Sequence, residues 1–243
     1  MDVEGRGALV TGGAVRIGRA VARTLAEHGA SVFIHYNRSR EAASTLQEEI
    51  WAVGGTAEIG TSDLSDPSQA AALVRVASDA VGPVSILVNS ASGFPRDRLE
   101  NLTPSTWQEA QDLTLGSPLF LTQAMSASLP EGVEGSVVNV SDVKTARPDS
   151  EHFSYVLAKG GVDALTRASA LALAPTIRVN AVALGNILSP VGEPENRARS
   201  PVRDVPLQRM GGAAAVSEAV LFLIRNDFIT GETIRLDGGA HLL

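Results

Sequence analysis

Tyr155 and Lys159 lie four residues apart in a segment, residues 152–174, whose pattern predicts a helix, so their side chains share one helix face. The chain has only two tyrosines and two lysines, which makes a chance pairing at this spacing rare. A hydride delivered to a C=O or C=N bond leaves a heteroatom that needs a proton. We expect Tyr155 to supply it, with the Lys159 ammonium lowering its pKa from the ordinary value of about 10. The alternative is a surface lysine beside a half-buried tyrosine.

A glycine-rich turn, TGGAVRIG at residues 11–18, connects a predicted strand at 7–11 to a predicted helix at 16–28. Glycines let the backbone approach a ligand, and the free N–H groups at a helix start attract phosphates. The Arg16 guanidinium, one turn inside that helix, can reach a phosphate or a bound ring. The turn is therefore a candidate dinucleotide site, although any tight strand-to-helix connection favours glycine.

The residues after the second predicted strand indicate which dinucleotide would bind. They include no Asp or Glu to hold both ribose hydroxyls of NAD; in their place stand Tyr36, Asn37, Arg38 and Ser39. Arg38 with Ser39 favours a 2′-phosphate and hence NADPH. The alternative for Arg38 is an ordinary solvated residue at a helix start.

The ends of the third and fourth predicted strands supply further candidate cofactor contacts. These are Asp63, Leu64, Asn89, Ser90, Ala91 and Ser92. Asp63 and Asn89 are also common as helix caps and turn formers.

Short β-rich runs alternate with amphipathic stretches along the chain, which is typical of βαβ units around a parallel sheet. Strands are predicted at residues 7–11, 31–35, 56–60, 84–89, 135–141, 176–182 and 232–237. Helices are predicted at 16–28, 40–53, 67–81, 104–128, 152–174 and 213–225. We expect one α/β domain, residues 1–243. A proline-rich tract at 185–206 is predicted to be a substrate lid, the alternative being a poorly packed loop.

Composition excludes several classes of protein. The chain has no cysteine, hence no disulfide framework, thiolate nucleophile or cysteine-ligated metal. The histidine spacing predicts no metal site. A net charge of −7 argues against nucleic-acid binding. No apolar run is long enough to span a membrane and no secretory signal is evident, so we expect a cytoplasmic protein.

TGGAVRIG, VNSAS, SYVLAK, RVNAVALG and ITGETIRLDGG together resemble the short-chain dehydrogenase/reductase family over nearly the whole chain. The resemblance implies a Rossmann-like, doubly wound sheet of seven parallel strands with helices on both faces, and a homotetramer. It also implies that Tyr155 is the acid and Lys159 its activator. The cofactor contacts it implies include the Gly12, Ile17 and Gly18 backbone, Asn89, and Gly185 and Ile187 after the sixth strand.

Position 142 departs from the family pattern, since Asp142 stands where a Ser usually holds the substrate carbonyl. With Arg16, Ser92 and Phe94, this residue makes the chain resemble the pteridine reductase branch, which implies that a pterin lies between the nicotinamide and Phe94. Ser92 and Arg16 would touch both cofactor and pterin, and Asp142, Tyr155 and Lys159 would form the catalytic set. A partly buried carboxyl can stay protonated and donate to a ring nitrogen. Alternatively, Asp142 only forms a turn and Ser141 does the usual work, or Phe94 only plugs a loop.

The chain departs from family patterns at other positions too. Thr114 replaces an Asn that supports a proton relay through Lys159, and Leu184 replaces the Pro of a Pro-Gly turn. Val15 and Asn37 replace basic or imidazole residues of the pteridine branch. The favoured hypothesis is an NADPH-dependent reductase of a pterin, dihydropterin or dihydrofolate. The alternatives are a carbonyl reductase acting on a 3-oxoacyl thioester or small ketone, and an NADPH-binding sensor or scaffold without turnover.

Overall fold

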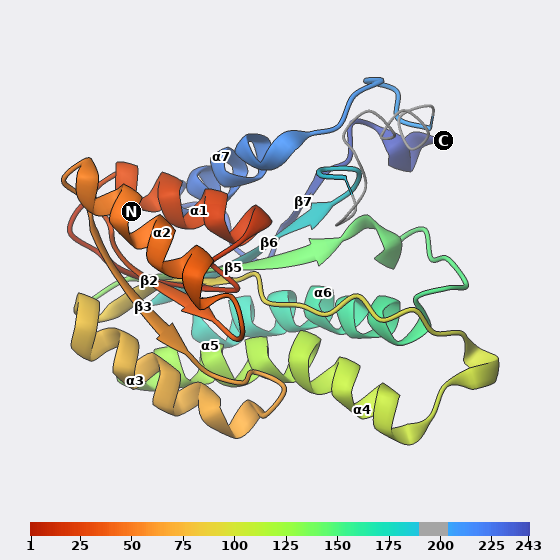
Figure 1. The fold of residues 1–243 in the computed structure, drawn as a ribbon, viewed down its shortest axis with the longest axis horizontal. Helices are drawn as coiled ribbons and strands as arrows, with labels where there is room; N and C mark the ends of the chain where they lie inside the picture. The colour runs from red at the N-terminus through yellow and green to blue at the C-terminus, as the bar shows by residue number, and fades with distance from the viewer. Residues whose placement is uncertain (190–203) are drawn as a thin grey trace.

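The computed structural model describes residues 1–189 and 204–243, and within these ranges seven parallel strands form one sheet (Figure 1). Their order is β3-β2-β1-β4-β5-β6-β7, which reverses direction between β1 and β4 and so confirms the doubly wound, Rossmann-like prediction. The bounds are β1 (Gly7–Thr11), β2 (Ser31–Tyr36), β3 (Thr56–Thr61), β4 (Val84–Asn89), β5 (Gly135–Asp142), β6 (Ile177–Leu184) and β7 (Thr233–Leu236).

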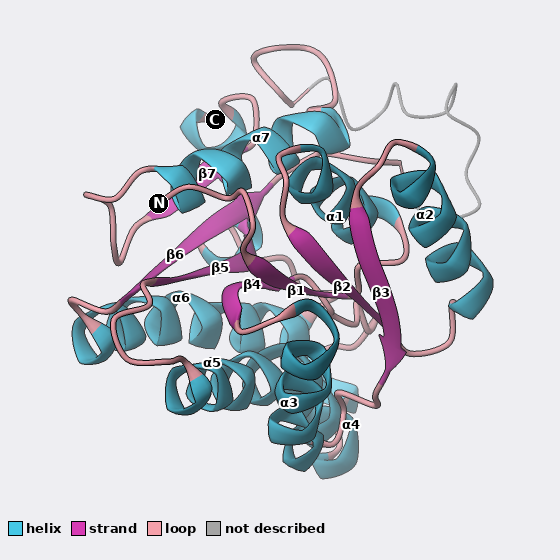
Figure 2. Ribbon diagram, turned by 90° about the vertical axis from the view of Figure 1, so that its left-hand side faces the viewer, coloured by secondary structure: helices cyan, strands magenta, loops and turns pink. Residues whose placement is uncertain are grey.

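Helices cover both faces of the sheet, as Figure 2 shows: α1, α2 and α7 lie on one face and α3, α4, α5 and α6 on the other. The bounds are α1 (Arg16–Glu27), α2 (Arg40–Ala52), α3 (Ala70–Val81), α4 (Pro104–Gln111), α5 (Ser117–Ser128), α6 (Phe153–Leu173) and α7 (Gly212–Arg225). Short 3₁₀ turns are η1 (Pro67–Gln69), η2 (Leu99–Asn101), η4 (Val143–Thr145) and η6 (Ala240–Leu242).

The core consists of two apolar clusters, one on each face of the sheet, because strand side chains alternate between the faces. Along β1, Ala8 and Val10 belong to the cluster under α1, α2 and α7, whereas Leu9 belongs to the cluster under α3, α5 and α6. Ile34 and Phe33 of β2 divide in the same way. Burial on both faces explains why β1, β2 and β4 are nearly continuous apolar runs.

The predicted helix at 104–128 is wrong in one respect. A π-helical turn, η3 (Asp112–Gly116), separates α4 from α5 and buries Thr114. Pro118, at the start of α5, has no N–H to donate to the carbonyl four residues earlier, so the regular α-helical pattern cannot continue through this segment.

Residues 190–203, most of the tract predicted as a lid at 185–206, lie outside the described residues. None of the helices within 1–189 and 204–243 combines the length and apolar character needed to cross a membrane.

Candidate active site

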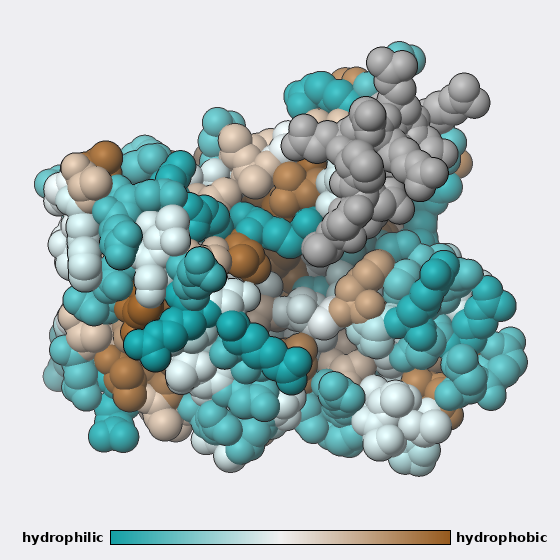
Figure 3. All heavy atoms as spheres, in the orientation of Figure 1, coloured by the Kyte–Doolittle hydropathy of each residue, from teal (hydrophilic) through white to brown (hydrophobic). Residues whose placement is uncertain are grey.

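A cavity of about 390 Å³ opens where the carboxyl ends of the strands meet, the edge at which open parallel sheets bind ligands. Figure 3 shows the surface hollowed on this side of the molecule. Nine predicted site residues line the cavity: Gly12, Arg16, Ile17, Gly18, Asn37, Leu64, Ser90, Ala91 and Ser92. His35, which sequence reasoning did not single out, also lines it.

The glycine-rich turn follows β1 and requires glycine at two positions for different reasons. Gly12 has a φ of +62°, a conformation that favours glycine. A Cβ at Gly18 would overlap the carbonyl oxygen of Gly12, so α1 can pack this closely on the turn only without a side chain there. The result is a smooth backbone cradle at the start of a helix.

Arg16 differs from its prediction, because it is the first residue of α1 rather than one turn inside it. Its backbone is left-handed, with a φ of +52°, and its Nη2 donates a 3.0 Å hydrogen bond to the carbonyl oxygen of Ser189. The guanidinium thus crosses from the glycine-rich turn to the segment after β6 while lining the cavity.

The residues present fit a dinucleotide. The cradle of Gly12 and Gly18 leaves room for a phosphate at the N-terminus of α1. Asn89, 4% exposed at the end of β4, donates from Nδ2 to Asn139 Oδ1 at 2.8 Å. Among the described residues its Oδ1 has no hydrogen-bond partner, and a buried orphan acceptor beside a ligand cavity is suited to a bound donor.

The segment after β2 places Asn37 and Arg38 at the surface and Tyr36 in the core. Arg38 lies near Asp63, whose pKa is held below its ordinary value by hydrogen bonds from Ser65, with a smaller contribution from the Arg38 charge. Arg38 is therefore exposed next to Asn37, which lines the cavity.

Several predicted cofactor residues do not form the wall of this cavity: Tyr36, Arg38, Ser39, Asp63, Asn89, Tyr155, Lys159, Gly185 and Ile187. Gly185 donates its N–H to Leu236 O at 3.0 Å, and Ile187 packs in the core cluster beneath α7. In the part of the chain that the structure describes, Gly185 and Ile187 therefore pack the segment that follows β6 against the core.

Tyr155 and Asp142 meet at the carboxyl end of β5. The Tyr155 hydroxyl donates a 2.8 Å hydrogen bond to Asp142 Oδ2, while Asp142 Oδ1 accepts from the backbone N–H of Lys144, also at 2.8 Å. Asp142 is half-buried, and one oxygen of its carboxyl is hydrogen-bonded to the phenol. Asp142 therefore stabilises its own turn through Oδ1 and contacts Tyr155 through Oδ2.

Lys159, one turn after Tyr155 on α6, is 4% exposed and donates from Nζ to Val140 O at 2.6 Å. Burial lowers the pKa of Lys159 to about 8, against the opposing charges of Asp142 and Asp163. Its Nζ lies 5.6 Å from the centre of the Tyr155 ring.

The expectation that Lys159 lowers the pKa of Tyr155 is wrong for this structure. Burial raises the pKa of Tyr155 well above its ordinary value, and the negative charge of Asp142 and its hydrogen bond raise it further. Burial removes water from the phenolate, and the Asp142 carboxylate lies 2.8 Å from the hydroxyl; both raise the pKa. Together they outweigh the Lys159 ammonium, which lies 5.6 Å from the centre of the ring. Tyr155 is therefore protonated.

Phe94 lies in the loop after β4 and is 55% exposed. It stacks on His152 with ring centres 3.8 Å apart and meets Tyr155 edge-on at 4.8 Å. The fold therefore brings Phe94, Tyr155 and Asp142 together from three separate segments. Ser92, two residues earlier, lines the cavity and lies 3.5 Å from Thr114 of the π-helical turn.

Asp97, which sequence reasoning missed, fixes the Phe94 loop to the start of α6. This buried carboxylate accepts hydrogen bonds from the backbone N–H of Ser154 at 3.0 Å and from its hydroxyl. The backbone N–H of Asp97 donates to Glu151 O at 2.9 Å. An Asp in a loop carries no sequence signal for such a contact, because its partner lies 57 residues away.

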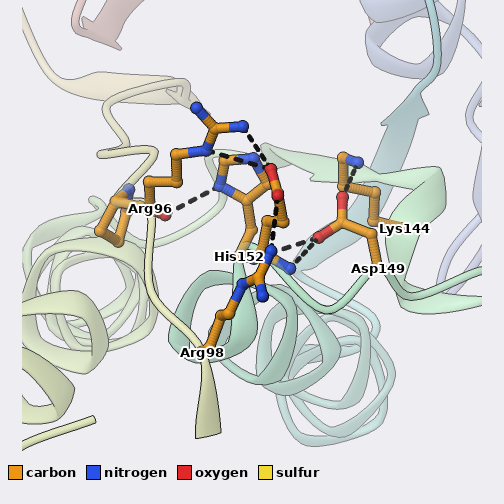
Figure 4. A network of polar contacts seen from close by, with 7 residues as sticks. Arg96, Arg98, Lys144, Asp149 and His152 are labelled. Atoms are coloured by element: carbon orange, nitrogen blue, oxygen red, sulfur yellow. Dashed lines mark hydrogen bonds and ion pairs between the residues drawn. The ribbon is translucent and has the colours of Figure 1, made fainter. Parts of the chain in front are cut away.

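Figure 4 shows the polar network outside this contact. Arg96 and Arg98 both pair with Glu151, Lys144 pairs with Asp149, and His152 Nδ1 donates to Pro95 O at 2.8 Å. The contacts of Arg96, Arg98 and His152 join the loop before α4 to the loop before α6.

The comparisons with known proteins agree with this geometry. A family model of short-chain dehydrogenases/reductases, described as enoyl-(acyl carrier protein) reductase, matches residues 12–241. FolM alternative dihydrofolate reductase 1 from Brucella canis, crystallised with NADP, is 38% identical with a TM-score of 0.95, covering 100% of this chain and 96% of that one. The corresponding Brucella suis protein in complex with NADP is 38% identical, with a TM-score of 0.94 and coverage of 100% and 97%.

A sequence relative is named for a different activity. The 3-oxoacyl-[acyl-carrier-protein] reductase FabG of Staphylococcus aureus (strain Mu50 / ATCC 700699) is 31% identical over 98% of each chain. Both kinds of relative span nearly the full length of this chain. The chain belongs to the short-chain dehydrogenase/reductase family.

Proposed function

We propose that this protein is an NADPH-dependent pteridine reductase, which transfers a hydride to a C=N bond of a pterin, dihydropterin or dihydrofolate. The observation that carries the proposal is the 2.8 Å hydrogen bond from Tyr155 to the half-buried carboxyl of Asp142. A serine at this position would bind a carbonyl oxygen but supply protons poorly, whereas a carboxyl can relay a proton to a ring nitrogen.

NADPH is the proposed cofactor. The solved FolM relatives contain NADP, and this chain has a glycine cradle, a buried orphan oxygen on Asn89 and the exposed Arg38 around its cavity. Ile17 and Gly18 would hold the phosphates, Gly12 would leave room for them, and Arg38 with Ser39 would hold the 2′-phosphate. Bound NADPH would supply the hydride.

The residues of the chain account for the remaining chemistry. When the carbon of a C=N bond gains a hydride, its nitrogen must gain one proton. Tyr155 would supply that proton, and Asp142 is hydrogen-bonded to the same hydroxyl. Phe94, next to Tyr155, offers an aromatic surface to a flat heterocycle.

A carbonyl reductase acting on a 3-oxoacyl thioester or small ketone is the second candidate. The activity for which the Staphylococcus aureus relative is named favours this candidate. Protonation of a ketone oxygen would need Tyr155 but not Asp142. An NADPH-binding sensor without turnover is a third, based on Thr114 at the position where the family usually has an Asn.

NADPH oxidation by the purified protein tests the proposal, with biopterin, dihydrobiopterin, dihydromonapterin and dihydrofolate as substrates and acetoacetyl thioesters as competitors. We expect turnover of at least one pterin. Turnover of the thioesters alone selects the carbonyl reductase, and tight NADPH binding without any turnover selects the sensor.

We also propose a cytoplasmic homotetramer. Exposed apolar side chains on the outer surfaces of α5 and α6, namely Leu119, Phe120 and Leu157, support self-association. Light scattering coupled to size-exclusion chromatography measures the assembly directly, and a monomer at micromolar concentration contradicts it.

A further inference from the structure

His35, near the carboxyl end of β2, is 2% exposed, and its ring lies in the wall of the cavity. The chemistry proposed above does not use it. A buried polar ring needs a hydrogen-bond partner for each nitrogen, so the identity of those partners indicates what the ring does.

The first set of partners is the glycine-rich turn. The backbone N–H of Gly12 donates to His35 Nδ1 at 3.2 Å, and the backbone N–H of Gly13 donates to the carbonyl oxygen of His35 at 2.8 Å. One residue of β2 therefore binds two consecutive amides of the turn. Because an amide N–H can only donate, Nδ1 carries no proton.

The second partner is the loop after β3. A neutral imidazole with a bare Nδ1 has its proton on Nε2, and His35 Nε2 lies 3.0 Å from the carbonyl oxygen of Ser62, to which it donates. Leu64, two residues later, lines the cavity. Burial lowers the pKa of His35, partly offset by the Ser62 hydrogen bond, so the ring stays neutral and Nδ1 stays an acceptor.

We propose that His35 is a positioning residue of the cofactor site, whose ring sets the spacing between the glycine-rich turn and the Ser62–Leu64 loop across the cavity. This inference rests on the NADPH binding proposed above. Gly12 contributes the absence of a side chain to the cradle, while its N–H is taken by His35. Removing the acceptor leaves a buried amide without a partner, and the turn can relax away from the geometry that receives a phosphate.

Two substitutions separate this role from simple packing. In His35→Asn, the side-chain oxygen occupies the position of Nδ1 and can still accept from Gly12, although the bond to Ser62 is lost. In His35→Leu both bonds are lost. Phe33→Leu is the matched control, since Phe33 is equally buried on the same strand but its side chain has no atom that can hydrogen-bond the glycine-rich turn or Ser62.

The experiment measures the NADPH dissociation constant of each folded variant by titration calorimetry, together with KM for NADPH, kcat and Tm. We expect His35→Leu to raise the dissociation constant about ten-fold or more, the loss expected for one unsatisfied buried amide. His35→Asn should recover most of the affinity. The effect should fall on KM for NADPH rather than on kcat. Phe33→Leu should lower Tm and leave the dissociation constant within about two-fold.

Amide hydrogen exchange without NADPH gives a second readout, in which Gly12 exchanges faster in His35→Leu than in the wild type and in His35→Asn. If His35→Leu does not fold, His35→Gln replaces it, because its longer side chain reaches toward Ser62 but not Gly12. If the wild type and the variants that lack the Nδ1 acceptor bind NADPH equally well, the inference about His35 is wrong and the proposed function is unaffected. Failure of the wild type to bind NADPH would overturn the proposed function and the inference together.

Discussion

The Tyr155 hydroxyl donates to Asp142 Oδ2, while Asp142 Oδ1 accepts the backbone N–H of Lys144. The carboxyl at the end of β5 is thus held by its own turn and oriented toward the phenol of α6. This arrangement keeps Tyr155 protonated, since burial and the carboxylate both raise the pKa of the phenol. In the proposed function, this pair would pass a proton to the substrate.

Replacing Tyr155 by Phe removes the proposed proton donor and leaves the ring in place. We expect kcat to fall about 10²- to 10⁴-fold, the usual contribution of general acid catalysis. The NADPH dissociation constant should change by less than about three-fold. Single-turnover kinetics with titration calorimetry checks both, and unchanged turnover would remove Tyr155 from the mechanism.

Asp142→Ser and Asp142→Asn separate the two roles of the carboxyl. Both side chains retain an oxygen that can accept from Lys144 N–H, so the turn should persist. Neither can relay a proton as a carboxyl can, so we expect kcat for pterins to fall more than kcat for small ketones. Losses of equal size on both substrates would count against a protonating role for Asp142.

Turnover should decline as the pH rises through about 8, because the proposed catalytic set includes Lys159 as an ammonium beside Tyr155. Burial lowers the pKa of Lys159 to about 8, so its ammonium is lost above that pH and retained below it. Asp163→Asn removes a negative charge that raises this pKa, so the decline should move to lower pH. Asn can still accept from Ser141, which now donates to Asp163 at 2.6 Å. A pH–kcat profile that coincides with that of the wild type would refute the assignment.

Asp97→Ala should raise KM for pterins, because the loop that carries Phe94 loses its buried anchor at Ser154. Phe94→Leu should raise the same KM about three- to ten-fold through the loss of aromatic packing. Arg96→Ala is the control, since that exposed ion pair with Glu151 is expected to contribute little. Steady-state kinetics at saturating NADPH provides the measurement, and an Arg96 effect as large as that of Asp97 would argue against a specific anchor.

Arg38→Leu should weaken NADPH about ten-fold and leave NADH affinity nearly unchanged, because only NADPH carries the 2′-phosphate. Arg40→Leu, at the first position of α2, is a matched control that should affect neither. Dissociation constants for both cofactors test the assignment. A parallel loss of NADPH and NADH affinity in Arg38→Leu would contradict phosphate recognition.

The pattern of the chain predicted most element bounds closely, since buried parallel strands and amphipathic helices have distinct periodicities. The predicted strand at 84–89 has the same bounds as β4, and the predicted helix at 213–225 begins one residue after α7 does. The break at η3 escaped prediction, because the residues from 104 to 128 have a continuous helical pattern and the π-helical turn depends on local packing around Thr114 and Pro118.

The sequence by itself determined the order of strands and helices, the glycine-rich turn and the one-turn spacing of Tyr155 and Lys159, because each is a local property of neighbouring residues. Only the tertiary structure decided that Asp142 bonds Tyr155, that Asp97 holds Ser154, and that His35 joins Gly12 to Ser62. It also reversed the expected pKa shift of Tyr155. These contacts join segments distant in the chain, and desolvation depends on everything packed around a group, so neither can be read from local spacing.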